Sequence, residues 1–213
     1  MKLLLIGCTG FIGKELLPML INADNEIILI SRKPINYFKP EKKILEKIQF
    51  IKTDLSKSEN WKNDSILNAL EEAQGVINLA GEPITEKRWT KQQKELIEQS
   101  RIKTTKYLVQ SIKRSKNPPK VLINASAIGY YGTSLDKTFS ENSPPGNDFL
   151  ASVCKGWEKN ALEASNKTRL IILRIGIVIG KDGGALSKML PIFKIGLGGP
   201  IGDGKQWMSW IHR

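Results

Sequence analysis

One seven-residue stretch near the start of the chain limits the folds open to it. Gly7, Gly10 and Gly13 have the spacing G-x-x-G-x-x-G, between an apolar run at residues 2–6 and helical apolar spacing at residues 11–22. Such glycines provide a tight turn, a close backbone approach and close helix–strand packing. Free N–H groups at the start of the following helix favour an anion. The stretch predicts a dinucleotide-binding turn; the alternative is a tight structural turn that holds no ligand.

Strand and helix patterns alternate along the rest of the chain. Strands are predicted at residues 26–31, 48–53, 75–79, 121–125 and 170–174, and helices at residues 65–72, 89–113 and 149–165. This order predicts an α/β fold, a Rossmann-like doubly wound parallel sheet. Pro18 predicts a kink or an early end of the first helix. Residues 33–47 are predicted to be a loop with a short helix, and residues 128–147 a loop.

The pattern changes after Arg174. Residues 175–213 are rich in glycine around a single helical stretch at residues 185–195, and they end in an apolar segment. We predict a dinucleotide-binding domain at residues 1–174. Residues 175–213 would begin a substrate-side lobe beyond the carboxyl edge of the sheet, and we expect this lobe to be incomplete.

Charge and composition narrow the classes of function. The 213 residues include 33 Lys plus Arg against 21 Asp plus Glu, a net charge of +12, which raises nucleic acid or phosphate as ligands. The lysines are scattered, without an arginine-rich arm, zinc spacing or aromatic RNA-binding motif, so no nucleic-acid partner is predicted. No metal site is predicted. Two cysteines cannot form a disulfide scaffold, and no apolar run approaches the ~20 residues of a membrane span. We expect a cytoplasmic protein.

The end of the second strand indicates which dinucleotide is preferred. Proteins that prefer NAD place an acidic residue there, which bonds the adenosine ribose. Here the strand ends in Ser31, Arg32 and Lys33. Because these side chains can bind a 2′-phosphate, they predict NADP; the alternative is an ordinary basic loop.

Two further strand ends should line the same crevice. Asp54 and Leu55 follow the third strand, where a contact with the adenine edge is expected. Ala80 and Gly81 follow the fourth strand, and their small size lets the backbone pass beneath a cofactor.

Taken together, these stretches resemble a known family. The chain is similar to extended short-chain dehydrogenases/reductases of the NAD-dependent epimerase/dehydratase type. More narrowly, it resembles an atypical subgroup of epimerase family proteins, some labelled cell-division inhibitors. The resemblance is carried by TGFIG at residues 9–13, SRKP at 31–34, NLAGEPI at 78–84, RW at 88–89, SR at 100–101, DFLA at 148–151, WE at 157–158, RIG at 174–176, LGGPIG at 197–202 and SWIH at 209–212.

The resemblance implies a set of cofactor contacts and a small-molecule substrate. The implied cofactor contacts are Thr9, Gly10, Phe11, Ile12, Ser31, Arg32, Leu79, Ala80 and the helix face from Glu95 to Arg101, with Ala125 and Ser126 beneath the nicotinamide. Family chains continue beyond the Trp-Ile-His segment, which is why the substrate lobe is expected to be incomplete. In many relatives the helices at residues 89–113 and 149–165 pair two subunits, which would allow a homodimer.

Catalysis departs from the pattern of the wider superfamily. Active members use a Ser or Thr with Tyr-x-x-x-Lys, in which the Lys cation lowers the Tyr pKa. Ser126 suits the first role, but the Tyr-x-x-x-Lys slots hold Leu150 and Cys154 or, shifted by one, Ala151 and Lys155. The resembled subgroup shares this loss. Tyr131, with Lys155 as the cation, is the alternative proton donor that we consider.

Three functions follow from these observations. The first is an NADP-dependent oxidoreductase, similar to an epimerase or dehydratase, acting on an unknown substrate such as a nucleotide sugar. The second is a non-catalytic NADP(H)-binding or sensing protein. The third, a basic nucleic-acid-binding module, has only the net charge in its favour.

Overall fold

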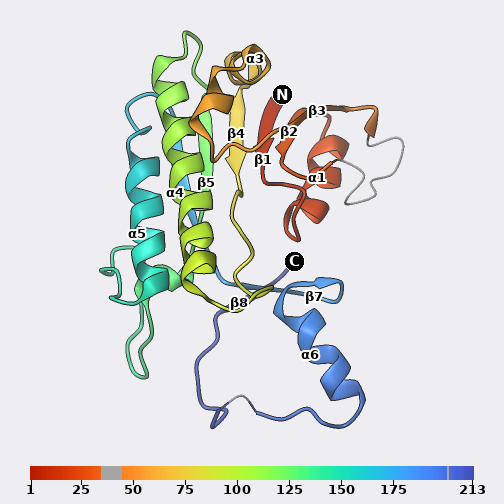
Figure 1. Ribbon diagram of the computed structural model, residues 1–213, viewed down its shortest axis with the longest axis vertical. Coiled ribbons are helices and arrows are strands. Elements are labelled where there is room, and N and C mark those ends of the chain that lie inside the picture. Colours follow the sequence, from red (N-terminus) through yellow and green to blue (C-terminus); the bar gives the residue numbers. More distant parts are fainter. Residues whose placement is uncertain (35–44, 201) are drawn as a thin grey trace.

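The computed structural model describes residues 1–34, 45–200 and 202–213 (Figure 1). Its main sheet has six parallel strands in the order β3-β2-β1-β4-β5-β6. The strands are β1 (Lys2–Ile6), β2 (Glu26–Ser31), β3 (Ile48–Lys52), β4 (Gly75–Asn78), β5 (Val121–Ala127) and β6 (Arg169–Ile175). The helices are α1 (Gly13–Asn22), α3 (Asp64–Glu72), α4 (Lys91–Arg114), α5 (Phe149–Leu162) and α6 (Gly184–Lys194). The predicted α/β Rossmann-like fold is confirmed, whereas most of the loop predicted at residues 33–47 lies outside the described residues.

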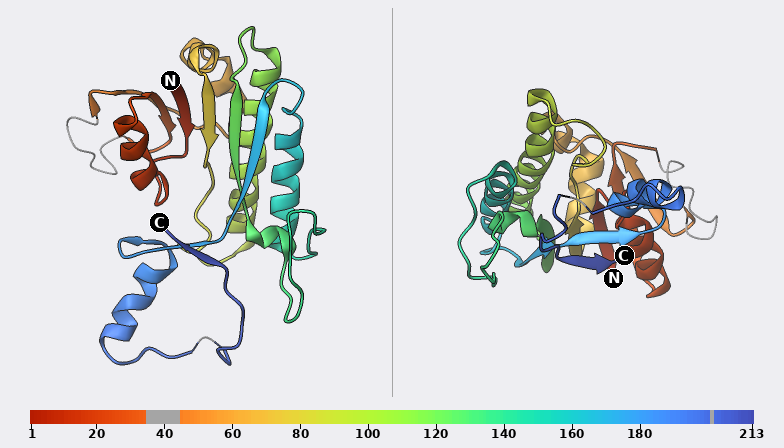
Figure 2. Two further views of the ribbon diagram at one scale, coloured as in Figure 1. Left: turned by 180° about the vertical axis from the view of Figure 1, so that it is seen from behind. Right: turned by 90° about the horizontal axis from the view of Figure 1, so that it is seen from below.

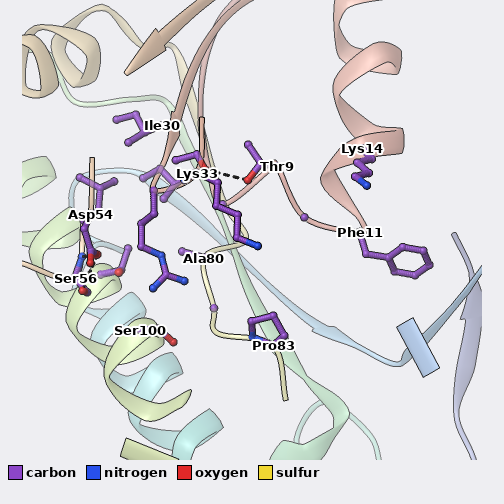
Figure 3. Close-up of a pocket in the computed structure, with 18 of the residues that line it drawn as sticks. Thr9, Phe11, Lys14, Ile30, Lys33, Asp54, Ser56, Ala80, Pro83 and Ser100 are labelled. Carbon is purple, nitrogen blue, oxygen red and sulfur yellow. Dashed lines mark hydrogen bonds between the residues drawn. The ribbon is translucent and has the colours of Figure 1, made fainter. Parts of the chain in front are cut away.

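The strand order reverses direction at β1, because the chain builds outward first through β2 and β3 and then through β4, β5 and β6. In open α/β sheets, ligands bind outside the carboxyl ends of the strands at such a reversal. Here the ends of β1, β2 and β4 surround a cavity (Figure 3).

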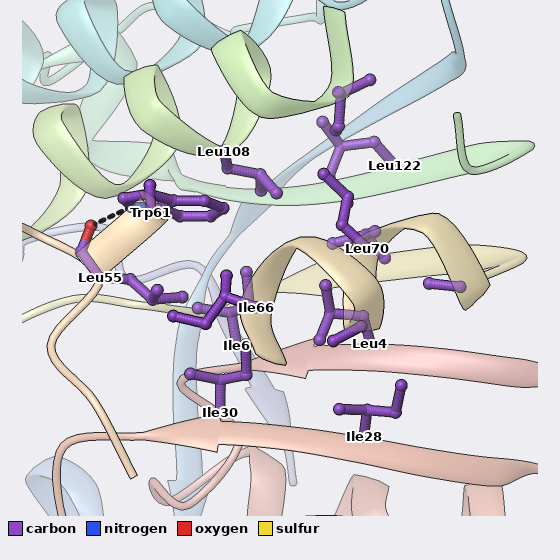
Figure 4. Close-up of a cluster of buried hydrophobic side chains, with 14 of the residues drawn as sticks. Leu4, Ile6, Ile28, Ile30, Leu55, Trp61, Ile66, Leu70, Leu108 and Leu122 are labelled. Atoms are coloured by element: carbon purple, nitrogen blue, oxygen red, sulfur yellow. Dashed lines mark hydrogen bonds between the residues drawn. The ribbon is translucent and has the colours of Figure 1, made fainter. Parts of the chain in front are cut away.

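Each face of the sheet has its own core. On one face, side chains of β1, β2, β4 and β5 pack against α3 and α4, with Trp61 at the edge (Figure 4). On the other face, Leu17 and Ile21 of α1 pack against β1 and β2. The same side of β5 and β6 is less covered, since Leu173 is 42% exposed. Burial is therefore deepest around β1 and β2, the strands that carry the cavity.

Of the kink or early end predicted at Pro18, the early end does not occur. The helix continues through Pro18 to Asn22. An interior proline costs ~3 kcal/mol because it removes one helix hydrogen bond. Leu17 and Ile21 are 0% and 4% exposed, so the turns on both sides of the proline are anchored on the sheet. Their burial, at ~1.5–3 kcal/mol for each side chain, is enough to offset the cost.

The other element boundaries match the predicted ones to within three residues, with differences that have local causes. The helix α4 begins at Lys91 rather than residue 89, because Thr90 Oγ1 accepts a hydrogen bond from the Gln93 N–H and caps the helix. Two 3₁₀ helices are present, η2 (Ser58–Lys62) and η3 (Ile128–Tyr131). The second lies within the loop predicted at residues 128–147, and no element was predicted at residues 58–62. Both 3₁₀ helices are too short for a periodic signal.

Residues beyond β6 form a small separate layer past the carboxyl ends of the main strands (Figures 1 and 2). The strands β7 (Ile177–Gly180) and β8 (Trp210–His212) pair in parallel, with α6 between them in the chain. The predicted domain boundary after Arg174 falls one residue before the end of β6. No residue of α6 is buried, and Trp207 is 86% exposed.

Within the described residues, none of the helices combines the length and the apolar character needed to cross a membrane. The same part of the chain contains no cluster of side chains suited to hold a metal ion.

Candidate cofactor site

The glycine turn between β1 and α1 is tight for reasons that its backbone shows directly. Gly7 has φ +74°, and a Cβ on it would lie 2.6 Å from the backbone of Ala80. A Cβ on Gly13 would lie 2.0 Å from the carbonyl oxygen of Cys8. A Cβ on Gly10 would meet only the Gly7 oxygen, at 3.6 Å. Gly7 and Gly13 are thus required by packing, whereas Gly10 leaves its backbone accessible from the cavity.

The turn is tied to the end of β2 by a buried hydroxyl pair. Thr9 Oγ1 and Ser31 Oγ are 3.0 Å apart, and the Ser31 hydroxyl also accepts a hydrogen bond from the Lys33 N–H at 3.2 Å. Helix α1 begins without a side-chain cap, and the Lys14 and Glu15 N–H groups donate to the carbonyl oxygens of Gly10 and Ile12. The turn of residues 10–13 lies at the positive end of the helix dipole, which favours an anion. The polar ends of β1 and β2 therefore face one shared space.

That space is a cavity of about 420 Å³ at the carboxyl edge of the sheet (Figure 3). The predicted cofactor residues that line it are Gly7, Thr9, Gly10, Phe11, Ser31, Arg32, Asp54, Leu55, Ala80 and Gly81. They come from four separate chain segments, as expected for strand ends that meet at one edge.

Six other predicted cofactor residues do not line the cavity: Ile12, Gly13, Leu79, Glu95, Arg101 and Ala125. The Glu95 side chain is on the exposed surface of α4, and Ala125 is 5% exposed within β5. Arg101 Nη1 donates hydrogen bonds to the carbonyl oxygens of Glu82 and Ile97. Their contact with a cofactor stays a prediction.

Other residues also line the cavity, and the sequence did not single out all of them. Ser100, within the predicted helix face from Glu95 to Arg101, and Thr104 line it from α4, at the i and i+4 positions of one helix face. Lys33, predicted with Ser31 and Arg32, and Lys14 of α1, which was not predicted, line it as well (Figure 3). Residues 182–184 close it from the C-terminal layer.

The predicted adenine contact Asp54 already has partners within the chain. Its Oδ1 accepts hydrogen bonds from the N–H of Ser56 at 3.0 Å and from the Ser56 hydroxyl at 2.7 Å. Leu55 is 4% exposed and belongs to the core beneath α3. The carboxylate of Asp54 thus shapes the turn after β3, and its contact with the adenine stays a prediction.

Arg32 forms an ion pair at the edge of the cavity. Its Nη2 donates to Glu82 Oε2 at 3.1 Å, and Lys87 Nζ lies 3.7 Å from Glu82 Oε1. Burial alone would raise the pKa of Glu82, but the hydrogen bond and charge of Arg32, with the charge of Lys87, lower it below the usual value. Glu82 therefore stays ionised at neutral pH beside two cations.

Phe11 joins the glycine turn to the C-terminal layer. Ideal Cβ atoms on Gly180, Gly183 and Gly184 would lie 2.8, 2.4 and 3.1 Å from its ring. The Arg213 guanidinium lies 4.5 Å above the same ring and pairs with Glu15 of α1 at 2.7 Å. The C-terminal layer is thereby fastened over the turn.

A buried polar network supports the floor of the site. Asn78 Nδ2 donates to Thr105 Oγ1 and Asn124 Oδ1, while Asn78 Oδ1 accepts from the Ala80 N–H. Trp157 Nε1 also donates to Thr105 Oγ1, at 2.8 Å. These bonds join β4, β5, α4 and α5, and they hold the backbone of Ala80 against Gly7.

The predicted catalytic hydroxyl belongs to a second buried network. Ser126 Oγ donates to Glu158 Oε1, and Arg174 donates to both oxygens of the same carboxylate, at 2.9 and 2.8 Å. Arg174 Nη1 also donates to Tyr131 Oη at 2.8 Å. The structure thus links Ser126 and Tyr131 through Glu158 and Arg174. The hydrogen bond to Glu158 raises the pKa of Arg174.

Lys155 is not part of that network. Its side chain is exposed on α5 and makes no hydrogen bond or ion pair within the described residues. The cation beside the Tyr131 phenol is Arg174 instead. Cys154, in the other register, is 4% exposed, and burial raises the pKa of its thiol. The structure therefore does not bring the three predicted catalytic side chains together as a Ser, Tyr and Lys triad.

A parallel sheet with its strand reversal at β1, and a glycine turn opening onto a cavity there, define the Rossmann-like class of α/β proteins. Within this class, the family model "NAD dependent epimerase/dehydratase family" matches residues 3–213. The chain belongs to that family.

Individual relatives agree with this assignment. The chain is 43% identical over 211 residues to the chloroplastic epimerase family protein SDR39U1 homolog of Arabidopsis thaliana, covering 97% of this chain and 57% of the relative. It is 36% identical to the human epimerase family protein SDR39U1, covering 100% of this chain and 66% of the relative. The chain thus spans less than two thirds of either relative. The names of these relatives give no role in cell division.

Solved structures show the same similarity. A crystal structure of human epimerase family protein SDR39U1 (isoform 2) with NADPH matches with a TM-score of 0.81 at 34% identity, over 100% of this chain and 66% of that one. A UDP-glucuronic acid 4-epimerase from Bacillus cereus matches with a TM-score of 0.79 at 23% identity, over 100% of this chain and 69% of that one. The second likeness concerns the fold alone.

Proposed function

We propose that this chain binds NADP(H), in preference to NAD(H), in the cavity at the carboxyl edge of the sheet. The observation that carries the proposal is the lining of that cavity: an open Gly10 backbone and the start of α1 on one side, Ser31 and Arg32 on the other. The human relative crystallised with NADPH supports the choice of cofactor.

The residues present fit such a cofactor. The turn of residues 10–13 at the start of α1 would hold the pyrophosphate, and the lack of a side chain on Gly10 would let the phosphate approach the backbone closely. Arg32 would bond the 2′-phosphate. Ala80 and Gly81 would let the backbone lie close to the ribose. When bound, the nicotinamide supplies a hydride donor or acceptor.

We further propose an oxidoreductase similar to an epimerase or dehydratase, acting on a small molecule such as a nucleotide sugar. Ser126 Oγ and Tyr131 Oη are the hydroxyls proposed to move the substrate proton. Arg174 would stabilise the phenolate of Tyr131, a role that Lys155 was first expected to fill. Family membership supports this reaction class, and the substrate itself is open.

One observation favours a non-catalytic NADP(H)-binding or sensing protein as the second candidate. The Ser126 hydroxyl donates to Glu158, and Leu150 and Cys154 occupy the Tyr-x-x-x-Lys slots. A single-turnover assay separates the two candidates, by following NADPH absorbance with a panel of carbonyl compounds. Loss of absorbance that depends on Tyr131 supports the enzyme, and no loss with any compound supports the sensor.

The cofactor proposal is tested by thermal-shift and calorimetric titration with NADPH and NADH side by side. A charge-assisted hydrogen bond contributes ~1.5–3 kcal/mol, so Arg32→Glu should weaken NADPH binding at least tenfold. Binding of NADH should change less than twofold. Lys106→Glu, the same charge change on the exposed side of α4, should leave both cofactors unaffected. Equal losses for both cofactors, or no binding of either by the unaltered protein, would refute the proposal.

A further inference from the structure

Glu82 does not itself line the cavity, but it holds the side chain of Arg32, which does. Its own position is fixed twice through the backbone: its N–H donates to Ser100 Oγ at 2.9 Å, and its carbonyl oxygen accepts from Arg101 Nη1 at 3.0 Å. Its side chain is 15% exposed, whereas that of Arg32 is 48% exposed. In this pair the acid is the fixed member and the arginine is the adjustable one.

The geometry of the pair leaves most of the guanidinium available. Arg32 Nη2 donates to Glu82 Oε2. A guanidinium is planar and carries five N–H donors in a fixed fork, so holding one amino group fixes the direction of the others. The second Nη2 hydrogen, together with the Nε or Nη1 hydrogen on the edge that Glu82 leaves open, can then meet two oxygens of one phosphate. Without Glu82, the half-exposed and flexible Arg32 side chain would lose more conformational entropy on binding a phosphate than it does when the carboxylate already holds it.

The carboxylate also carries a charge that would repel a phosphate. Lys87 lies 3.7 Å from its other oxygen, so two cations face one anion and the group of Glu82, Arg32 and Lys87 is positive overall. The attraction toward a phosphate therefore survives the presence of Glu82. What the carboxylate adds is orientation.

We propose that Glu82 is a positioning residue that orients Arg32 toward the 2′-phosphate and thereby strengthens the preference for NADP(H) over NAD(H). This inference rests on the proposed function. It predicts that Glu82 matters for one cofactor and not for the other, because NADH has no 2′-phosphate for Arg32 to meet.

The test compares Glu82→Ala and Glu82→Gln by calorimetric titration with NADPH and NADH. Glu82→Ala should weaken NADPH binding five- to tenfold and change NADH binding less than twofold. Glu82→Gln should stay within threefold of the unaltered protein for NADPH, because its side-chain oxygen accepts the same hydrogen bond from Arg32. Glu163→Ala, which removes an exposed ion pair with Lys113 at a residue that does not line the cavity, is the matched control and should alter neither affinity.

A double variant connects the effect to Arg32. In an Arg32→Gln background, adding Glu82→Ala should change NADPH affinity less than twofold, since nothing is left to orient. Unfolding midpoints without cofactor check that each variant folds, and Glu82→Ser replaces Glu82→Ala if that variant does not. Three results would overturn this inference and leave the proposed function standing. They are tighter NADPH binding by Glu82→Ala, equal losses of NADPH and NADH affinity, or a loss in the double variant equal to the product of the two single losses. An unaltered protein without preference for NADPH overturns the proposed function as well.

Discussion

Replacing Glu158 by alanine tests whether the buried network of Ser126, Glu158 and Arg174 stabilises the fold. The Glu158 side chain is 7% exposed and accepts hydrogen bonds from Ser126 Oγ and from two nitrogens of Arg174. Removing one partner of a buried ion pair costs about 3–5 kcal/mol, because the other charge is left without compensation. Arg174 is 19% exposed and keeps hydrogen bonds to Tyr131 and to the Glu141 carbonyl, so the lower end of that range applies.

We therefore expect Glu158→Ala to lower the free energy of unfolding by about 3 kcal/mol. Urea unfolding followed by tryptophan fluorescence measures this, because Trp61 and Trp157 are buried. The control is Glu163→Ala, which removes an exposed ion pair with Lys113 and should cost less than ~1 kcal/mol. A cost for Glu158→Ala no larger than that of the control would refute the reasoning. It would mean that Ser126 is free to serve a substrate.

Two more predictions follow from the glycine turn and the cysteines. Gly13→Ala should lower the free energy of unfolding by more than ~3 kcal/mol or prevent folding, because its Cβ would lie 2.0 Å from the Cys8 oxygen. Gly10→Ala should unfold at the same urea concentration as the unaltered protein but lose NADPH affinity. Burial raises the pKa of the Cys8 thiol to about 12 and also raises that of Cys154, so both stay protonated at pH 8. Neither should react with a disulfide reagent in the native protein, and both should react once it is unfolded; a fast-reacting equivalent in the native state would contradict this.

The sheet and the glycine turn were predictable because their signals are local. Each strand is a short apolar run bounded by polar or glycine residues, and the turn from Gly7 to Gly13 occupies seven consecutive positions. The sequence predicted a kink or an early end of the helix at Pro18, and the early end is absent, since the helix propensity of proline is a local cost and the burial of Leu17 and Ile21 is a tertiary gain. Prediction succeeded where the local conformational preference of the residues and their tertiary packing favour the same structure.

The finer parts of the site were not predictable because they join distant segments. Glu82 meets Arg32 across fifty positions of sequence, and nothing in either segment indicates the pair. Glu158 reads as an ordinary surface residue of a helix, since glutamates are seldom buried, yet it lies against Ser126 and Arg174. On α4, polar residues occur on every side, so sequence could not decide which of them face the cavity.

The packing of Phe11 against Gly180, Gly183 and Gly184 has a consequence for how such chains vary over evolution. Segments about 170 residues apart in sequence share one volume here, since ideal Cβ atoms on the three glycines would come within 2.8, 2.4 and 3.1 Å of the aromatic ring. A larger residue at positions 180, 183 or 184 becomes tolerable only after the ring has been replaced by a smaller side chain. Homologous sequences should therefore show correlated substitution, with glycine retained at these positions wherever an aromatic residue occupies position 11.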